Sequence, residues 1–176
     1  IWITGASSGI GEAMALEFST LGANLILSSR DKTALQKVKS SCDQPEKVFV
    51  LQMDLSKTNE MEQLVTKARS CFGTIDILIN NAGHLIGRST IEEMSDEHWH
   101  KIMDVNLSST FYCTRAVLPY MNNGWGRIVN MSSLAARNGG GDGAVAYAAS
   151  KGAIIADTRG LAKEVAGKGI TVNGLA

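Results

Sequence analysis

The chain has 176 residues, with 17 Lys and Arg balanced by 17 Asp and Glu, and hydrophobic residues make up 44% of it. This length and composition are typical of one domain with a substantial core, so we expect residues 1–176 to form a single domain. The zero net charge provides no basic field for nucleic acid, and no apolar run reaches the roughly 18 residues that a membrane span requires.

The first expected element is a short β-branched strand at residues 1–4, which runs into Gly5-Ala6-Ser7-Ser8-Gly9-Ile10-Gly11 and then into a helical pattern that stops at Gly22. In this context glycines let the backbone approach a pyrophosphate, and the helix N-terminus offers free N–H groups. The spacing is neither G-x-G-x-x-G nor that of the nucleoside-triphosphate loop, which would end in Gly-Lys-Ser/Thr. We interpret the segment as a phosphate site, with an ordinary glycine-rich turn as the alternative.

Two residues of opposite charge, Arg30 and Asp31, follow the second expected strand. In dinucleotide folds an acid about 20 positions past the glycines binds the ribose hydroxyls of NAD, whereas an Arg accepts the 2′-phosphate of NADP. The Arg30/Asp31 pair therefore points to both cofactors. The alternative for each residue is that it is simply exposed to solvent at the end of the strand.

Strands and helices alternate along the chain. The expected strands are residues 1–4, 24–29, 48–53, 75–79, 126–131 and 170–176. The expected helices are residues 12–21, 33–41, 57–72, 96–118 and 147–166, with Ser56 and Ser95 as N-caps of the third and fourth. The alternation predicts an α/β fold, a doubly wound parallel sheet with right-handed crossovers. Such a sheet binds ligands at the carboxyl ends of its strands, where the glycine-rich turn, Arg30, Asp54 and residues 80–83 all fall.

Three polar residues stand out in the two long helices. Asn106 lies among apolar neighbours, so we expect it to be buried and hydrogen-bonded. Tyr147 and Lys151 stand four residues apart among small side chains, which places them on one helix face. A phenol is a poor acid or base near neutral pH because its pKa is about 10, and a neighbouring cation favours the phenolate. Taken alone, this spacing is more often an accident of the helix repeat.

The remaining signals concern the compartment and the chain ends. The chain has an odd number of cysteines at wide spacings, Cys42, Cys71 and Cys113, so we expect reduced thiols. The three histidines lack metal-ligand partners, so we expect no metal. We also expect a cytoplasmic protein without a signal peptide. The first expected strand has no turn before it and nothing follows the last one. We therefore expect a chain truncated at both ends, with a sheet edge left to be covered.

Together, TGASSGIG at residues 4–11, the Asn-Asn-Ala-Gly stretch at residues 80–83, Asn106, Ser133 and the Tyr147/Lys151 pair resemble the short-chain dehydrogenase/reductase family. The resemblance runs from the first residue to the last. It implies a Rossmann-type domain of three layers that uses NADP(H) or NAD(H) to reduce ketones or oxidise secondary alcohols. The second half looks most like bacterial 3-oxoacyl-thioester reductases.

The family resemblance also implies residue roles. Tyr147 would be the general acid/base, Lys151 would lower its pKa and hold the nicotinamide ribose, Ser133 would hydrogen-bond the substrate oxygen, and Asn106 would hold a water that relays protons. The implied cofactor-binding residues are Gly5, Ser7, Ser8, Gly9, Ile10, Gly11, Ser29, Arg30, Asp54, Leu55, Asn81, Ala82, Gly83, Tyr147 and Lys151.

For the cofactor, Ser29 stands where NAD-preferring members usually have an acid, and Arg30 follows it as in many NADP-preferring members. Ser8, before the second glycine, is not basic, so another common NADP determinant is absent. We expect NADP, with NAD as the alternative.

Three departures from the family pattern bear on function. Nothing corresponds to the segment that covers the substrate and the seventh strand, so substrate identity is not specified, and a cofactor-binding fragment without turnover is the alternative function. The family pattern implies a homodimer or homotetramer through helices 96–118 and 147–166, but Asp157 puts a carboxylate where relatives place an apolar residue. The loop between Ser133 and Tyr147 is one residue longer than in many relatives.

An epimerase or dehydratase is disfavoured by the glycine spacing and by the short chain.

Overall fold

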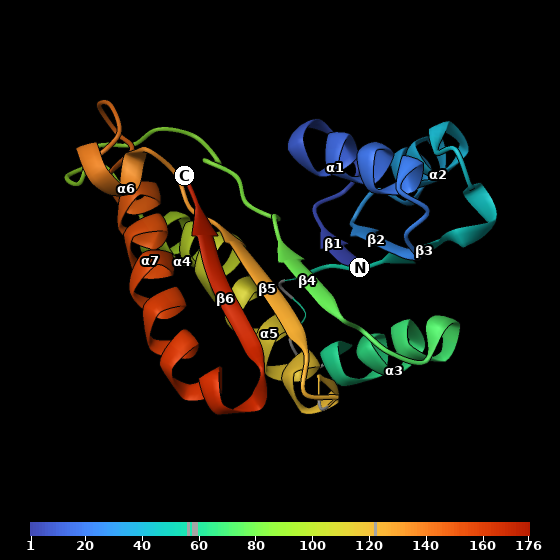
Figure 1. The fold of residues 1–176 in the computed structure, drawn as a ribbon. Helices are drawn as coiled ribbons and strands as arrows, with labels where there is room; N and C mark the ends of the chain where they lie inside the picture. The colour runs from blue at the N-terminus through green and yellow to red at the C-terminus, as the bar shows by residue number, and fades with distance from the viewer. Residues whose placement is uncertain (56, 58–59, 122) are drawn as a thin grey trace.

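Figure 1 shows the computed structural model, which describes residues 1–55, 57, 60–121 and 123–176. A sheet of six parallel strands lies at its centre, in the order β3-β2-β1-β4-β5-β6. The strands are β1 (Trp2–Thr4), β2 (Leu25–Ser29), β3 (Val48–Gln52), β4 (Ile77–Asn80), β5 (Gly126–Met131) and β6 (Ile170–Leu175). The helices are α1 (Gly9–Thr20), α2 (Lys32–Ser41), α3 (Met61–Phe72), α4 (Asp96–Met103), α5 (Ser109–Val117), α6 (Ala135–Asn138) and α7 (Val145–Val165). This arrangement confirms the predicted doubly wound fold.

Helices cover both faces of the sheet, and each face has its own core. Trp2 and Leu78 belong to a core with α3, α5 and the C-terminal end of α7, whereas the next residues along the same strands, Ile3 and Ile79, belong to a core with α1 and α2 (Figure 1). Successive side chains of a strand point to opposite faces, and a parallel sheet buries both. The short strands are therefore apolar at consecutive positions.

The helix starts follow local hydrogen-bond chemistry. Ser95 accepts a hydrogen bond from the His98 N–H at 3.1 Å, which confirms it as the N-cap of α4. Asp31 caps α2 in the same way, accepting from the Ala34 N–H at 2.9 Å. The predicted cap Ser56 lies outside the described residues, and the α-helical part of that element begins at Met61.

The predicted single helix over residues 96–118 is wrong in one respect, because a π-helical stretch, Asp104–Ser108, separates α4 from α5. The Asn106 side chain donates to the Ile102 carbonyl at 2.9 Å, and the Ser109 hydroxyl donates to the Val105 carbonyl at 2.7 Å. These side chains satisfy carbonyls along the widened turn, and π-bulges of this kind are frequent at functional sites.

All three cysteines have free thiols, and Cys42 and Cys113 are buried. Burial raises the pKa of the Cys113 thiol to about 12, which suppresses its reactive thiolate form. Among the helices that the structure describes, none is long and apolar enough to cross a membrane.

A buried chain of polar side chains joins the centre of the sheet to two helices. Asn80 and Asn130 are neighbours across β4 and β5, and the Asn80 amide donates to the Asn130 side-chain oxygen at 2.9 Å. Asn80 also donates to Thr114 on α5, and Asn130 donates to Thr158 on α7, both at 3.0 Å. All four residues are buried. This network ties β4 and β5, whose ends bear the predicted site residues, to the helices on one face.

We expect Asn130→Leu to lower the free energy of unfolding by about 2–4 kcal/mol, because it leaves Asn80 and Thr158 with unpaired polar atoms in the core. Urea unfolding monitored by circular dichroism measures the change. The control is Thr66→Ala, which removes a hydroxyl from the exposed face of α3 and should change stability by less than about 0.5 kcal/mol. An Asn130→Leu protein as stable as the unaltered chain would contradict the role given to this network.

Candidate active site

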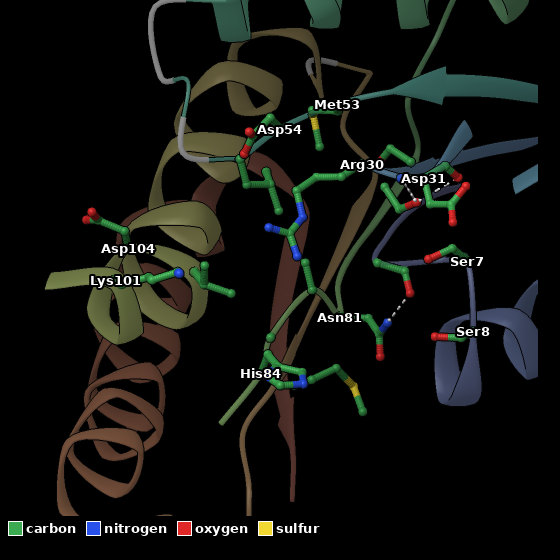
Figure 2. Close-up of a pocket in the computed structure, with 18 of the residues that line it drawn as sticks. Ser7, Ser8, Arg30, Asp31, Met53, Asp54, Asn81, His84, Lys101 and Asp104 are labelled. Atoms are coloured by element: carbon green, nitrogen blue, oxygen red, sulfur yellow. Dashed lines mark hydrogen bonds between the residues drawn. The ribbon is translucent and has the colours of Figure 1, made fainter. Parts of the chain in front are cut away.

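A cavity of about 1020 Å³ opens at the carboxyl ends of the strands, where the strand order reverses between β1 and β4 (Figure 2). The predicted site residues that line it are Gly5, Ser7, Ser8, Ile10, Ser29, Arg30, Asp54, Leu55, Asn81, Ala82, Gly83, Tyr147 and Lys151. The cavity thus brings together residues from the glycine-rich turn, the ends of four strands and α7. Its volume lies at the upper end of the range for small-molecule sites.

The glycine-rich turn leaves the start of α1 open to an anion. Gly5 and Gly9 have φ values of +65° and +57°, which favour glycine. A Cβ at Gly9 would meet nothing within 4 Å, whereas one at Gly11 would overlap the Gly5 carbonyl oxygen. Ser8 is the N-cap but makes no side-chain capping bond, so it leaves the first-turn N–H groups available. This open helix N-terminus fits a phosphate group.

The Asn-Asn-Ala-Gly stretch fastens the end of β4 to this turn. The Thr4 hydroxyl accepts from the N–H groups of Asn81 and Ala82, each at 3.0 Å. The Asn81 amide donates in return to the Thr4 carbonyl at 3.0 Å and to the Gly5 carbonyl at 3.1 Å. A Cβ at Gly5 would lie 2.8 Å from the Ala82 Cα. The two motifs therefore approach each other at backbone distance and form one wall of the cavity.

Lys151 is a buried ammonium that also lines the cavity. It is 3% exposed, and its Nζ donates to the Met131 carbonyl at 2.8 Å and lies 5.9 Å from the centre of the Tyr147 ring. Burial lowers its pKa to about 8. The Ser132 hydroxyl donates to the Lys151 carbonyl at 2.9 Å, which joins the end of β5 to α7. Tyr147 and Lys151 thus share a face, as predicted, with the lysine charge held inside the wall.

Asn106 lies behind this wall and is fully buried, as the sequence predicted. Its side-chain oxygen accepts from the His84 N–H at 3.0 Å, and its amide donates to the His84 carbonyl at 2.8 Å. A Cβ at Gly83 would lie 2.8 Å from this oxygen and 2.9 Å from the Lys151 Nζ. A side chain there would displace the Asn106 oxygen or the Lys151 Nζ, so Asn106 and Lys151 meet at Gly83.

Four predicted site residues do not line the cavity. Gly9 and Gly11 belong to the turn that shapes it, and Asn106 supports it from behind. Ser133 is half-buried, with its hydroxyl oxygen accepting from the Ala135 N–H at 3.2 Å, whereas the preceding Ser132 does line the cavity. The geometry therefore leaves the substrate-binding role of Ser133 a prediction.

One side of the cavity was not predicted from the sequence. Glu97, His100, Lys101, Asp104 and Val105 line it from α4 and the π-helical stretch. They recur at intervals of one or two helix turns, the spacing that places residues on one face. Because Ser95 marks the start of this helix, the spacing of these residues in the sequence indicates that they share one helix face. The cavity is also lined by Ser28, Asp31, Met53, His84, Met131 and Ser132.

Local hydrogen bonding differs between Arg30 and Asp31. The Asp31 carboxylate caps α2. For the Arg30 side chain, no hydrogen bond or ion pair is found within residues 1–55, 57, 60–121 and 123–176, and Figure 2 shows it reaching into the cavity. Lys101 reaches in from α4 on the opposite side, and Asp104 points away. Two cationic side chains therefore face the same part of the cavity.

Comparison with known proteins identifies similar chains along the full length. The family model of short chain dehydrogenases matches residues 1–176. The chain is 38% identical over 176 residues to the 3-oxoacyl-[acyl-carrier-protein] reductase FabG of Thermotoga maritima, covering 99% of this chain and 71% of that protein. A crystal structure of a short chain dehydrogenase from Bacillus anthracis superposes with a TM-score of 0.92 at 35% identity, covering 99% of this chain and 71% of the other. An NADH-dependent reductase, A1-R′, complexed with NAD superposes with a TM-score of 0.89 at 34% identity, covering 99% and 76%.

The burial of Lys151 makes stability depend on pH. A fall of its pKa from 10.5 to about 8 corresponds to roughly 3 kcal/mol in favour of the neutral amine. The folded chain therefore binds fewer protons than the unfolded chain between pH 8 and 10.5, and below pH 8 it carries the whole cost of the buried charge. We expect Lys151→Met to be more stable than the unaltered chain by about 1–3 kcal/mol at pH 7, allowing for the lost hydrogen bond to the Met131 carbonyl.

This gain should shrink as the pH rises from 8 to 10.5. Urea unfolding of both proteins across this range measures it. Lys37→Met, at an exposed position of α2, is the control and should show no such pH dependence. A Lys151→Met protein that is less stable than the unaltered chain at pH 7 would show that the buried charge is better compensated than its environment indicates.

Proposed function

The chain belongs to the short-chain dehydrogenase/reductase family of NAD(P)-dependent oxidoreductases, and we propose that it transfers hydride between bound NADP(H) and a ketone or secondary alcohol. The observation that carries this proposal is that one cavity is lined both by Tyr147 and Lys151 and by the open phosphate turn. The nicotinamide cofactor, when bound, supplies or accepts the hydride. The turn at Gly5–Gly11 would hold its pyrophosphate, and Asp54 and Leu55 would flank its adenine.

Tyr147 carries the proton transfer in this proposal. Its phenol protonates the carbonyl oxygen in reduction and recovers the proton in oxidation. With its pKa at about 8, Lys151 remains mostly protonated at pH 7, and its cation lies 5.9 Å from the centre of the Tyr147 ring. The Ser133 hydroxyl stabilises the substrate oxygen where charge develops. The Asn106 side chain fixes the backbone of His84, close to Lys151. Lys151 itself donates a hydrogen bond to the Met131 carbonyl at the cavity wall.

NADP is the preferred cofactor in this proposal. A 2′-phosphate adds about two negative charges, and Arg30 offers a guanidinium that the surrounding described residues do not engage. The neighbouring acid, Asp31, is used as the α2 cap. Lys101, opposite Arg30, supplies positive charge that Ser8 does not (Figure 2).

The substrate is a small ketone or alcohol, and a 3-oxoacyl thioester is the class we favour. The sequence of β5 and α7 and the 38% identity to a 3-oxoacyl-[acyl-carrier-protein] reductase support this choice. We further propose a cytoplasmic protein that forms a homodimer or homotetramer through α4, α5 and α7. Trp99 on α4 and Phe111 on α5 are exposed, which supports this contact. Asp157 on α7 is half-buried, and its pKa is raised by burial and by the nearby Glu164.

We expect Tyr147→Phe to lower turnover at least 100-fold while leaving cofactor affinity nearly unchanged, because only the transferable proton is removed. Nicotinamide absorbance measures turnover with acetoacetyl thioesters, diketones and sugars, and fluorescence titration measures cofactor binding. Tyr120→Phe removes a phenol outside the cavity and is the control. Full activity in Tyr147→Phe would refute the role of the phenol. Cofactor binding without turnover in the unaltered chain would instead identify a binding fragment.

We expect Arg30→Ala to weaken NADPH binding about 10- to 100-fold and NADH binding less than about 3-fold, because a charge-assisted contact to the 2′-phosphate is lost. Titration of the two reduced cofactors gives both dissociation constants. Lys37→Ala, which removes a positive charge on α2 outside the cavity, should affect neither. Equal losses for NADPH and NADH would contradict the NADP preference.

A further inference from the structure

The segment that follows β4 is organised around the imidazole of His84. Both backbone polar groups of His84 are held by the buried Asn106 side chain. The ring Nδ1 accepts a hydrogen bond from the Ile86 N–H at 2.7 Å. A nitrogen that accepts from an N–H carries no proton, so the neutral ring has its proton on Nε2. His84 is thus fixed at its backbone by Asn106 and at its ring by Ile86.

The residue that His84 holds is in a strained conformation. Ile86 has a φ of +66°, and within the part of the chain that the structure describes it is the sole non-glycine residue with a positive φ. The left-handed region is unfavourable for a β-branched side chain and persists only where the surroundings impose it. A His84 side chain that accepts the N–H two residues ahead copies the turn that Asn and Asp side chains make. The imidazole therefore compensates the strained backbone at Ile86.

Beyond Ile86 the same segment is fastened to the glycine-rich loop before α7. The Arg88 guanidinium donates to the Asp142 carbonyl at 2.7 Å, and the Ser89 N–H donates to the Gly143 carbonyl at 3.1 Å. Gly143 has a φ of +72°, and a Cβ there would lie 2.9 Å from the Ser89 nitrogen. The α7 helix begins two residues later, at Val145, and Tyr147 is its third residue. Contacts therefore run without a break from Asn106 to the start of the helix that bears Tyr147.

We propose that His84 is a positioning residue. Its Nδ1 holds the strained turn at Ile86, which docks Arg88 and Ser89 on Asp142 and Gly143 and so sets the N-terminal end of α7 and the phenol of Tyr147. The assignment of Tyr147 as the acid/base rests on the proposed function, but the contacts that His84 makes do not. His84 also lines the cavity, so a direct contact with the ligand is the competing explanation.

Two substitutions separate these explanations on the chain as it stands. His84→Asn keeps a short acceptor for the Ile86 N–H but lacks the reach of the ring, whereas His84→Phe keeps the ring and lacks the acceptor. We expect His84→Phe to speed amide exchange at Ile86 and Ser89 about 10-fold, measured by NMR, and His84→Asn to restore most of the protection. This measurement needs no turnover, so it stands or fails independently of the proposed function.

Kinetics of the same variants test the effect on Tyr147. We expect kcat to fall about 10-fold in His84→Phe and less than about 3-fold in His84→Asn, with the KM for the cofactor changing less than about 2-fold in both. Ile86→Gly removes the strain, because glycine adopts this φ readily. In the Ile86→Gly background, His84→Phe should therefore lower kcat less than about 2-fold.

The outcomes divide clearly. Loss of both exchange protection and kcat in His84→Phe, with recovery in His84→Asn and in the glycine background, supports the proposal. Equal defects in His84→Asn and His84→Phe, or a large rise in KM without loss of protection at Ile86, would overturn it in favour of a direct ligand contact. Unchanged exchange in His84→Phe would overturn it outright. If the unaltered chain shows no turnover, the exchange data still decide the role of His84, and the proposed function alone fails.

Discussion

A buried ammonium is the constraint around which the site is arranged. Lys151 is 3% exposed, and within the described ranges no carboxylate pairs with it. A lone buried charge is costly unless its hydrogen bonds are satisfied and the surrounding backbone is fitted to it. The Met131 carbonyl accepts from its Nζ, and Gly83 gives it room because any Cβ there would lie 2.9 Å from the nitrogen. The glycine after β4 thus leaves room for the lysine on α7.

The sheet topology brings these pieces together although they are far apart in the sequence. β1, β4 and β5 are neighbouring parallel strands, so their carboxyl ends lie at the same edge of the sheet. The segment that follows each of these strands reaches the cavity. The buried Asn80, Asn130 and Thr158 side chains then fix β4 and β5 against α7. The lysine therefore sits beside strands and a helix that buried side chains join by hydrogen bonds.

Sequence patterns predicted most of the fold because each signal was local. Apolar β-branched runs, the Ser95 cap and the glycine stops depend on residues within one turn of each other, and they marked the strands and most of the helices. The π-helical stretch was missed because its stabilisation is tertiary: Asn106 makes it favourable through bonds to His84, 22 residues away in the sequence. Which of Ser132 and Ser133 faces the cavity depends on how β5 ends, and the pattern of adjacent serines does not specify this.

The departures from local rules lie together. A buried lysine and a π-helical turn border the same cavity, and an isoleucine at positive φ lies two residues after His84, which also lines it. Each departure has an unfavourable free energy of its own, and each is accommodated by a neighbour: the His84 backbone pairs with Asn106, the His84 ring accepts from the Ile86 N–H, and Gly83 leaves space for Lys151. Because strain persists only where the surrounding structure imposes it, such a connected cluster is itself an argument for function. The two residues that meet at Gly83, Asn106 and Lys151, are accordingly the ones through which the fold and the proposed chemistry depend on each other.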